Sequence, residues 1–213
     1  MYRSAVASLM VQLLIALVTG AGLFIDIPSA VRNDLRAIFA LELASQVVEM
    51  VWYTVVVCRY RVILTWTRYI DWLISTPVML LSTILFFRLR QGLPLGEVWR
   101  DWRVYLVLGL DEVMLLFGFF MERGVLSPLT GLTLGGAAFV GAFTALAALL
   151  EASDSLSLGL YIAMYIVWGL YGVAAAFGDT VKNVSYNALD IVSKNFYGVF
   201  LFVYALTRVT PVT

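Results

Sequence analysis

The last apolar stretch of the chain carries a lysine and a carboxylate at a spacing that suits amine chemistry. Asp190 and Lys194 are four residues apart, so on a helix they share one face, one turn from each other. A buried lysine amine can condense with an aldehyde, and the resulting imine keeps a proton if carboxylates stabilise it. Asp190 and a second carboxylate would do that. The plainer alternative is a structural salt bridge that neutralises two buried charges.

Other charged residues also lie inside long apolar stretches. Each would be costly if it faced lipid, so we expect each to face the interior of a helical bundle. One such charge alone is equally well explained by a structural helix contact, but eight spread over four stretches indicate a functional interior. They are Glu42, Glu49, Arg68, Asp71, Asp111, Glu112, Asp190 and Lys194.

The composition indicates a membrane protein. The 213 residues are 62% hydrophobic and 13% charged, which is too apolar for an ordinary soluble domain. Lys and Arg number 14, as do Asp and Glu, so the net charge of zero gives no reason to expect nucleic acid as a partner. One cysteine, Cys58, and no histidine exclude an internal disulfide and leave metal chemistry without its usual ligands.

Charge clusters, prolines and glycines divide the chain into seven apolar stretches, each near the roughly 20 residues that a helix needs to cross a bilayer. The first stretch is long enough to be a span rather than a cleaved signal. We therefore predict an all-α membrane protein with a single seven-helix domain over residues 1–213. The predicted helices cover residues 5–25, 34–58, 65–87, 104–121, 128–150, 156–177 and 181–207.

The basic residues in the loops and at the ends of these helices and of the chain predict an orientation, because cytoplasmic loops of membrane proteins carry an excess of Lys and Arg. One side of the bundle holds Arg32, Arg36, Arg88, Arg90, Arg100, Arg103 and Arg208; the other holds Arg3, Arg59, Arg61, Arg123 and Lys182. The count of seven against five puts the N-terminus outside the cell and the C-terminus in the cytoplasm. The loop between the second and third helices, residues 59–64, is then external and very short.

The third predicted helix supplies the second carboxylate, in the run Arg68-Tyr69-Ile70-Asp71-Trp72-Leu73-Ile74-Ser75-Thr76-Pro77. This run resembles the microbial rhodopsins, in which an Arg-Tyr-x-Asp-Trp motif followed by a hydroxyl residue, Thr and Pro carries the principal counterion. The resemblance implies a seven-helix bundle with an internal pocket for all-trans retinal, bound to Lys194 as a Schiff base. It implies that Asp71 is the proton-accepting counterion, with Asp190 the other counterion, and that Arg68 tunes the external half of the pathway. Trp72 then packs against the polyene, with Ser75 and Thr76 hydrogen-bonded nearby.

Two further segments resemble the same family. Asp111 and Met114 resemble its buried fourth-helix aspartate and the methionine at the retinal ring, and Trp168 and Tyr171 resemble the aromatic pair that lines the retinal cavity. Such aromatic residues are ordinarily core, and Lys194 is what favours a cofactor pocket. The sixth helix departs from the family at Gly172 and Ala175, where pumps usually have a proline and a second tryptophan. The resemblance therefore implies a looser pocket near the ring and a different hinge. It covers the second to the seventh helix.

Whether light would drive a pump or open a channel depends on the residues in the cytoplasmic half of the bundle. Proton pumps of the family usually place a carboxylate eleven residues after the counterion, but this chain has Ser82 there, and serine is a poor proton donor. Glu42 and Glu49 lie two turns apart on one helical face. Together with Asn187 and Asn195 they resemble the cation pathway of the viral channelrhodopsins, rhodopsins of large algal viruses. We favour a light-gated cation channel. The alternative is a light-driven outward proton pump with Glu42 as the internal donor.

Other classes have less support. A photosensor or a transducer-coupled receptor has no positive support, because we expect no cytoplasmic domain and, apart from the connection at residues 88–103, only short cytoplasmic loops. We do not expect an enzyme, because no nucleophile and base pair or phosphate-binding loop is present. A chloride pump is disfavoured since those relatives replace the aspartate that is retained as Asp71. The expected partners are retinal, the lipid bilayer, transported cations or protons, and further copies of the chain in a homo-oligomer.

Overall fold

The structure, a computed structural model, describes residues 2–59 and 64–208. Within these residues seven helical stretches are long and apolar enough to cross a membrane, and no strand is present. The predicted all-α, seven-helix fold is confirmed. The first six spans contain α1 (Tyr2–Gly22), α2 (Ser29–Arg59), α3 (Arg68–Arg90), α4 (Trp102–Glu122), α5 (Pro128–Ala147) and α6 (Ser155–Ala175).

The seventh span is continuous but not uniform. It consists of α7 (Asp179–Asp190), a π-helical turn η3 (Ile191–Asn195) and α8 (Phe196–Leu206). Two short 3₁₀ helices complete the structure: η1 (Thr65–Thr67) leads into α3, and η2 (Leu95–Arg100) lies in the connection between α3 and α4. A π turn holds one more residue than an α turn, so it shifts the side chains that follow around the helix axis.

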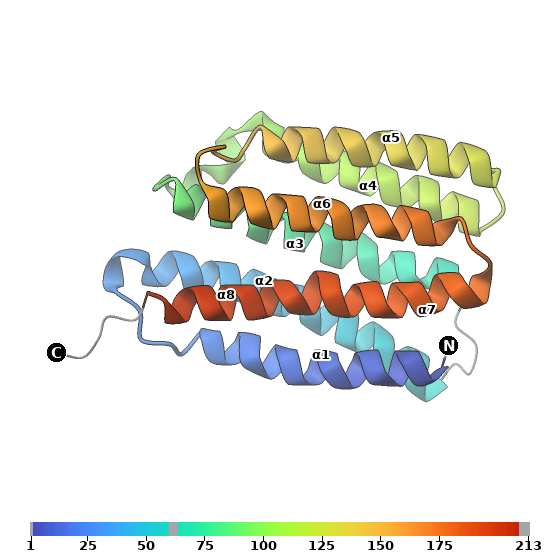
Figure 1. Cartoon of the computed structure of the whole chain (residues 1–213), viewed down its shortest axis with the longest axis horizontal. Coiled ribbons are helices and arrows are strands. Elements are labelled where there is room, and N and C mark those ends of the chain that lie inside the picture. The colour runs from blue at the N-terminus through green and yellow to red at the C-terminus, as the bar shows by residue number, and fades with distance from the viewer. Residues whose placement is uncertain (1, 60–63, 209–213) are drawn as a thin grey trace.

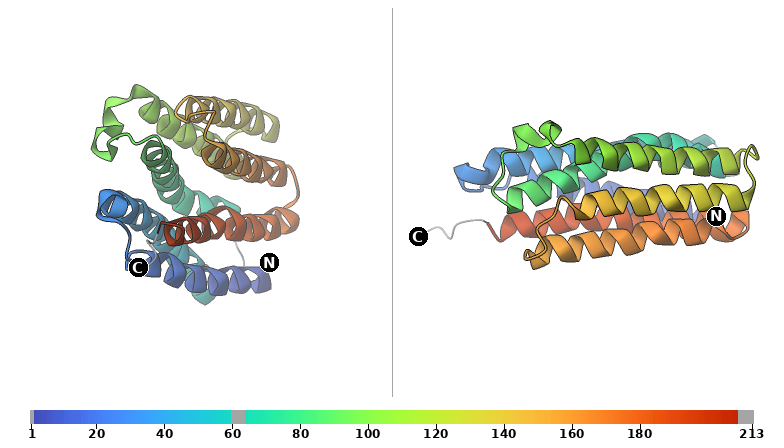
Figure 2. Two further views of the ribbon diagram at one scale, coloured as in Figure 1. Left: turned by 60° about the vertical axis from the view of Figure 1, so that its left-hand side comes forward. Right: turned by 90° about the horizontal axis from the view of Figure 1, so that it is seen from above.

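The helices run side by side along the long axis of the molecule (Figure 1). The start of α1 and the end of α8 lie at opposite ends of the bundle (Figures 1 and 2). We call these ends the N-terminal side and the C-terminal side. α4 packs closely on α5, and α2 on α3 and α1. The seventh span contacts α1 along its length, with α1 touching α7, η3 and α8. The interior between α1, α2 and the seventh span is therefore formed by segments from both ends of the sequence.

α2 begins earlier than predicted, at Ser29 rather than Asp34. Arg32 explains why, because its Nε donates to the Ile27 carbonyl at 2.8 Å and its guanidinium pairs with Asp26 at 2.9 Å. These contacts stabilise a first helical turn that contains Arg32, which was predicted to lie in a loop. At its other end α2 reaches Arg59 and exposes Cys58. Most of the predicted short loop at 59–64 lies outside the described residues.

The starts of the middle helices follow from capping side chains. Asp101 accepts from the Arg103 backbone amide, Ser127 from that of Thr130, and Asp154 from that of Leu156. Such oxygen atoms satisfy amides that have no partner within the helix. These starts lie within two residues of the predictions. The predicted ends of α5 and α6, at Leu150 and Phe177, are three and two residues too late.

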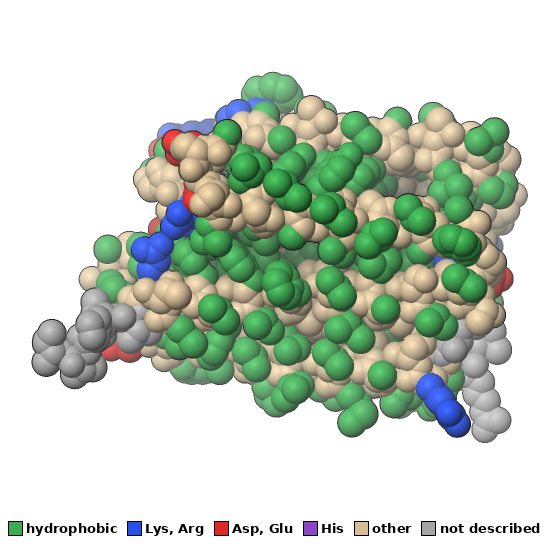
Figure 3. All heavy atoms as spheres, viewed as in Figure 1, with side chains coloured by type: hydrophobic (Ala, Val, Ile, Leu, Met, Phe, Trp, Pro, Cys, Tyr) green, Lys and Arg blue, Asp and Glu red, His purple; other side chains and the backbone are tan. Residues whose placement is uncertain are grey.

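The bundle is apolar outside and partly polar inside. Hydrophobic side chains cover the middle of the visible face, and charged side chains gather towards the two ends (Figure 3). α1 shows the contrast most clearly, because Leu17 is 73% exposed while Gln12 and Thr19 are fully buried. Lipid is as apolar as leucine, so burying apolar surface does not by itself bring membrane helices together. The polar face of α1 therefore indicates a polar interior.

Candidate functional site

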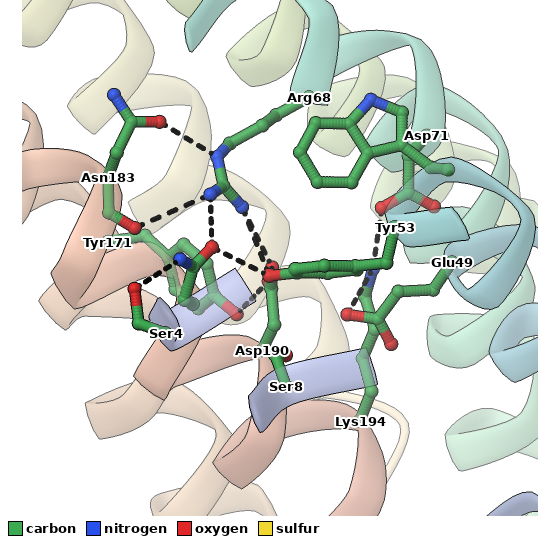
Figure 4. Close-up of polar contacts among 12 residues, drawn as sticks. Ser4, Ser8, Glu49, Tyr53, Arg68, Asp71, Tyr171, Asn183, Asp190 and Lys194 are labelled. Atoms are coloured by element: carbon green, nitrogen blue, oxygen red, sulfur yellow. Dashed lines mark hydrogen bonds and ion pairs between the residues drawn. The ribbon is translucent and has the colours of Figure 1, made fainter. Parts of the chain in front are cut away.

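The amine of Lys194 lies in the core of the bundle, 2% exposed, between two carboxylates. Its Nζ donates to Asp71 Oδ2 at 3.1 Å and to Ser75 Oγ at 3.0 Å, and lies 3.6 Å from Glu49 Oε1. α2, α3 and the π turn η3 each contribute to this group. Figure 4 shows Lys194 with Asp71 and Glu49 beside it. The predicted carboxylate from the third helix is thus in contact with the predicted reactive amine.

Asp190 is directed away from that amine. Within the part of the chain that the structure describes, its ion pair is with Arg68, whose Nη1 lies 3.1 Å from Asp190 Oδ2. Tyr53 donates to the same oxygen at 2.6 Å, and Tyr171 donates to Oδ1 at 2.8 Å. The spacing of four residues predicts direct contact between Asp190 and Lys194, but the π turn between them breaks the regular α-helical geometry. Glu49, expected only in an ion pathway, is the second carboxylate paired with the amine.

A dense hydrogen-bond network around Arg68 closes the N-terminal side of the site (Figure 4). The guanidinium is fully buried, with Nε donating to Asn183 Oδ1 at 3.0 Å and Nη2 to Asn187 Oδ1. The centre of the Trp52 ring lies 4.8 Å from Cζ of this guanidinium. Asn183 also donates to Thr65 Oγ1 at 2.8 Å, which ties η1 to α7. A buried charge needs this many partners to offset its loss of water.

A cavity of about 420 Å³ begins at Lys194 and extends between α3, α4, α5 and α6. Its walls are almost entirely apolar. Among the residues predicted to bind a cofactor, those that line it are Trp72, Thr76, Met114, Trp168, Tyr171 and Lys194. Gly172 and Ala175 also line it. These are the two positions at which pumps of the family usually have the larger residues proline and tryptophan. Asp111 lies behind this wall and accepts from Thr76 Oγ1 at 2.7 Å.

On the other side of Lys194, buried polar groups line the space where α1, α2 and the seventh span meet. Gln46 donates to Glu42 Oε1 at 3.1 Å, and Gln12 donates to Ser8 Oγ at 3.0 Å. Several atoms here have no hydrogen-bond partner among the described residues, although protein interiors usually satisfy such groups. They include Gln12 Oε1, Thr19 Oγ1, Glu42 Oε2, Gln46 Oε1, both Glu49 oxygens and both polar atoms of Asn195.

The C-terminal side is closed by aromatic residues. Ser82 lies 3.3 Å from the Tyr197 hydroxyl and donates to the Ile38 carbonyl at 3.4 Å. Beyond it, the Phe86 ring packs against those of Phe200 and Tyr204, with centroids 5.3 and 5.0 Å apart. The polar set is thus separated from both ends of the bundle, by Arg68 at one and by these rings at the other.

Sequence reasoning missed several residues of this site. Tyr53 and Asn183 hold Asp190 and Arg68, and Gln12, Thr19 and Gln46 extend the polar interior. All are uncharged, so a search for charges in apolar stretches passes over them. Their signal is periodicity: Ser8 and Gln12 are four residues apart, and Gln46 and Tyr53 follow Glu42 at helical spacings.

One predicted inward charge is placed differently. Seven of the eight charged residues are buried, but Glu112 is only partly buried. It directly follows Asp111, so it points about 100° further around α4 and cannot share the inward direction of that neighbour.

These features define a class of protein: a seven-helix membrane bundle with a buried lysine between carboxylates and an apolar cavity beside it. The family model described as bacteriorhodopsin-like protein matches residues 4–208. The chain therefore belongs to the bacteriorhodopsin-like family, and the resemblance inferred from its motifs is confirmed.

Solved structures of microbial rhodopsins share the fold. The viral rhodopsin OLPVRII superposes with a TM-score of 0.84 at 27% identity, covering 98% of this chain and 99% of its own. A blue light-absorbing proteorhodopsin from Med12 superposes with a TM-score of 0.78 at 18% sequence identity, covering 97% of this chain and 96% of its own. Halorhodopsin from Halobacterium salinarum superposes with a TM-score of 0.75 at 17% sequence identity, covering 97% of this chain and 93% of its own. No curated protein matches the chain.

Proposed function

We propose that the protein is a retinal-binding, light-gated cation channel. The observation that supports the channel most directly is the set of buried polar atoms between α1, α2 and the seventh span that have no hydrogen-bond partner among the described residues. Buried polar groups of this kind hold water or a transient ion in membrane pathways. The viral rhodopsin OLPVRII, at 27% identity over nearly the whole chain, supports the comparison with viral relatives.

The cavity fits retinal. Retinal is an apolar polyene aldehyde, and the cavity has apolar walls with the Lys194 amine at one end. Trp72, Met114, Trp168 and Tyr171 would hold the chain and ring. When bound through Lys194, all-trans retinal supplies light absorption and a change of shape.

The residues around Lys194 are arranged to move a proton. A positive Nζ is held by Asp71 at 3.1 Å and Glu49 at 3.6 Å. When the orientation of Nζ changes, its proton passes to Asp71 Oδ2, so that the N–H bond breaks and an O–H bond forms. Arg68 stays paired with Asp190 during this step. Neutralising Asp71 weakens the attraction that holds Lys194 against α2 and α3, which loosens the contact between these helices and the seventh span.

Glu42 is the residue on which the channel and the pump interpretations differ. Its Oε1 accepts from Gln46, while Oε2 has no hydrogen-bond partner among the described residues. A carboxyl group in this position would serve a pump as a proton donor to Nζ, because Ser82 at the usual donor position bonds to Tyr197 and the backbone instead. In a channel the same group attracts cations.

Recording photocurrents from cells that express the protein tests the proposal. A channel gives currents that reverse sign with voltage and shift with the cation gradient, whereas a pump gives outward current at all ordinary voltages. Currents that never reverse would show that the channel proposal is wrong and favour the pump. We expect Glu42→Gln to reduce the reversing conductance. In a pump the same change slows the return of the proton to Nζ. An unaltered current and photocycle would remove Glu42 from both schemes.

We also propose that the N-terminal side faces the outside of the cell, from the distribution of Lys and Arg. With that orientation Arg68 and Asp190 belong to the external half of the pathway, and Glu42 and Ser82 to the cytoplasmic half. Assembly into a homo-oligomer stays a prediction.

A further inference from the structure

Gly198 in α8 lies where polar side chains from two other helices meet. It is buried, and a methyl group at its Cα would overlap Gln46 Nε2 from α2 and Thr19 Oγ1 from α1. The two polar atoms therefore lie directly against the backbone of α8, at a residue that has no side chain. This meeting point is one turn beyond Lys194 along the seventh span, on the side that leads towards Glu42.

The oxygens at this point have no protein partner. Thr19 Oγ1, Gln46 Oε1 and Glu42 Oε2 are fully buried and form no hydrogen bond within residues 2–59 and 64–208. Leaving buried polar atoms unpaired is costly, so such groups ordinarily bind water or an ion. A hydroxyl, an amide carbonyl and a carboxylate are the oxygen types that coordinate hard cations.

We propose that Thr19, Gln46 and Gly198 form the narrowest polar site of the pathway, where a permeating cation exchanges part of its water shell for protein oxygens. Because Gly198 lacks a side chain, Gln46 and Thr19 can both approach the backbone of α8 at this point. The inference rests on the proposed channel function and adds three residues to it. Selective pathways use oxygen atoms at close quarters in this way, to replace water around an ion.

Gly198→Ala tests the site, and Gly159→Ala is its matched control. Gly159 lies in α6, where an added methyl group meets no atom within 4 Å. With an unchanged visible absorption spectrum, we expect Gly198→Ala to lower the photocurrent per pigment roughly tenfold, because the added methyl group forces Gln46 and Thr19 out of position. Gly159→Ala should leave the current unchanged. Adding Gln46→Ala to Gly198→Ala removes one of the two overlaps and leaves the one with Thr19 Oγ1, so it should restore part of the current.

Gln46→Ala alone gives a second measurement that does not depend on the glycine. A wider site should admit a larger cation, so we expect the permeability of methylammonium relative to sodium to rise roughly tenfold, as a one-methylene change in a fitted pocket does. The ratio follows from the shift of the reversal potential when external sodium is replaced by methylammonium. A purely structural role for Gln46 or Gly198 would change pigment yield or thermal stability without moving this ratio.

The outcomes separate the site from the channel itself. If wild-type currents never reverse, the channel proposal fails and this site fails with it. If they reverse but Gly198→Ala and Gln46→Ala keep the wild-type amplitude and permeability ratio, only the site is overturned. Should Gly198→Ala bind no retinal, the ratio measured for Gln46→Ala decides, and an unchanged ratio overturns the proposal.

Discussion

At the scale of single residues, the chemistry of the site depends on one buried amine. The chain contains two lysines, Lys182 and Lys194. Lys182 pairs with Glu122 at 2.7 Å near the N-terminal side, while Lys194 pairs with Asp71 and Glu49 at the cavity. The second lysine therefore offers a natural control for any test of the first.

We expect Lys194→Ala to abolish the visible absorbance that forms when retinal is added, because no other amine adjoins the cavity among its lining residues. Lys182→Arg removes the other lysine amine but keeps its positive charge beside Glu122. That variant should form pigment normally. Absorption spectroscopy of both purified variants checks the prediction, and visible pigment in Lys194→Ala would refute the assignment of the attachment site.

The sequence was sufficient to single out Lys194, Asp71 and Arg68, because a charge in an apolar stretch is conspicuous. It could not show which carboxylate pairs with which cation. That pairing depends on the π turn at Ile191–Asn195, which separates Asp190 from Lys194, and on the packing of α2, which brings Glu49 to the amine. Neither feature has a local sequence signal.

At the scale of elements, one partly buried ion pair joins the end of α3 to the start of α6. Arg90 donates from Nη2 and Nε to the two oxygens of Asp154 at 2.8 and 2.9 Å. Asp154 also caps α6 and accepts from Ser157 Oγ at 2.6 Å. These hydrogen bonds hold the pKa of Asp154 well below its ordinary value, and those from Arg90 have the largest effect.

This pair should give the protein a pH-dependent stability. A lowered pKa stabilises the fold above the pKa of about 4 that Asp has in an unfolded chain, and the contribution is lost as pH falls through the lower folded value. We expect Asp154→Asn, which keeps a capping side chain, to lower stability by about 1–3 kcal/mol at pH 7. The difference from wild type should narrow below about pH 4.

The midpoint temperature for loss of visible absorbance, measured from pH 3 to 8, checks this. Asp26→Asn is the control, because Asp26 is 93% exposed in its pair with Arg32 and such pairs contribute little. A difference for Asp154→Asn that stayed constant down to pH 3 would contradict the assigned role of its charge.

The helices themselves were largely predictable, since apolar length and capping residues mark most of their bounds. The polar face of α1 was not predictable from hydropathy. Gln12 and Thr19 add little to a hydropathy average, so the sequence predicts a plain apolar span. Their burial becomes clear only when α1 is placed against α2 and the seventh span.

At the scale of the whole molecule, the polar interior reduces stability, and the proposed pathway gives a reason for keeping it. Gln12 Oε1 is buried without a partner among the described residues, and its amide nitrogen bonds only to Ser8 Oγ. Replacing both partners of a buried hydrogen bond by apolar groups is often neutral or stabilising. An interior selected for stability alone would not keep this pair.

We therefore expect the double variant Ser8→Ala with Gln12→Leu to be at least as heat-stable as wild type and to carry less photocurrent per pigment. Thermal loss of absorbance and whole-cell recording measure the two effects. Leu17→Ile, at a position 73% exposed on the same helix, should change neither. A full-sized current in the double variant would remove α1 from the pathway.

Cys58, which is exposed beside the last residue of α2, has a practical consequence. It is the only cysteine in the sequence, so a thiol-reactive dye attaches at one defined position per chain without mutagenesis. With the proposed orientation, a membrane-impermeant maleimide should label intact cells from outside. Labelling that required permeabilised cells would reverse the orientation. The same dye, attached at the edge of the bundle and away from Lys194, would serve as a fixed reference for counting subunits and for following helix movement under illumination.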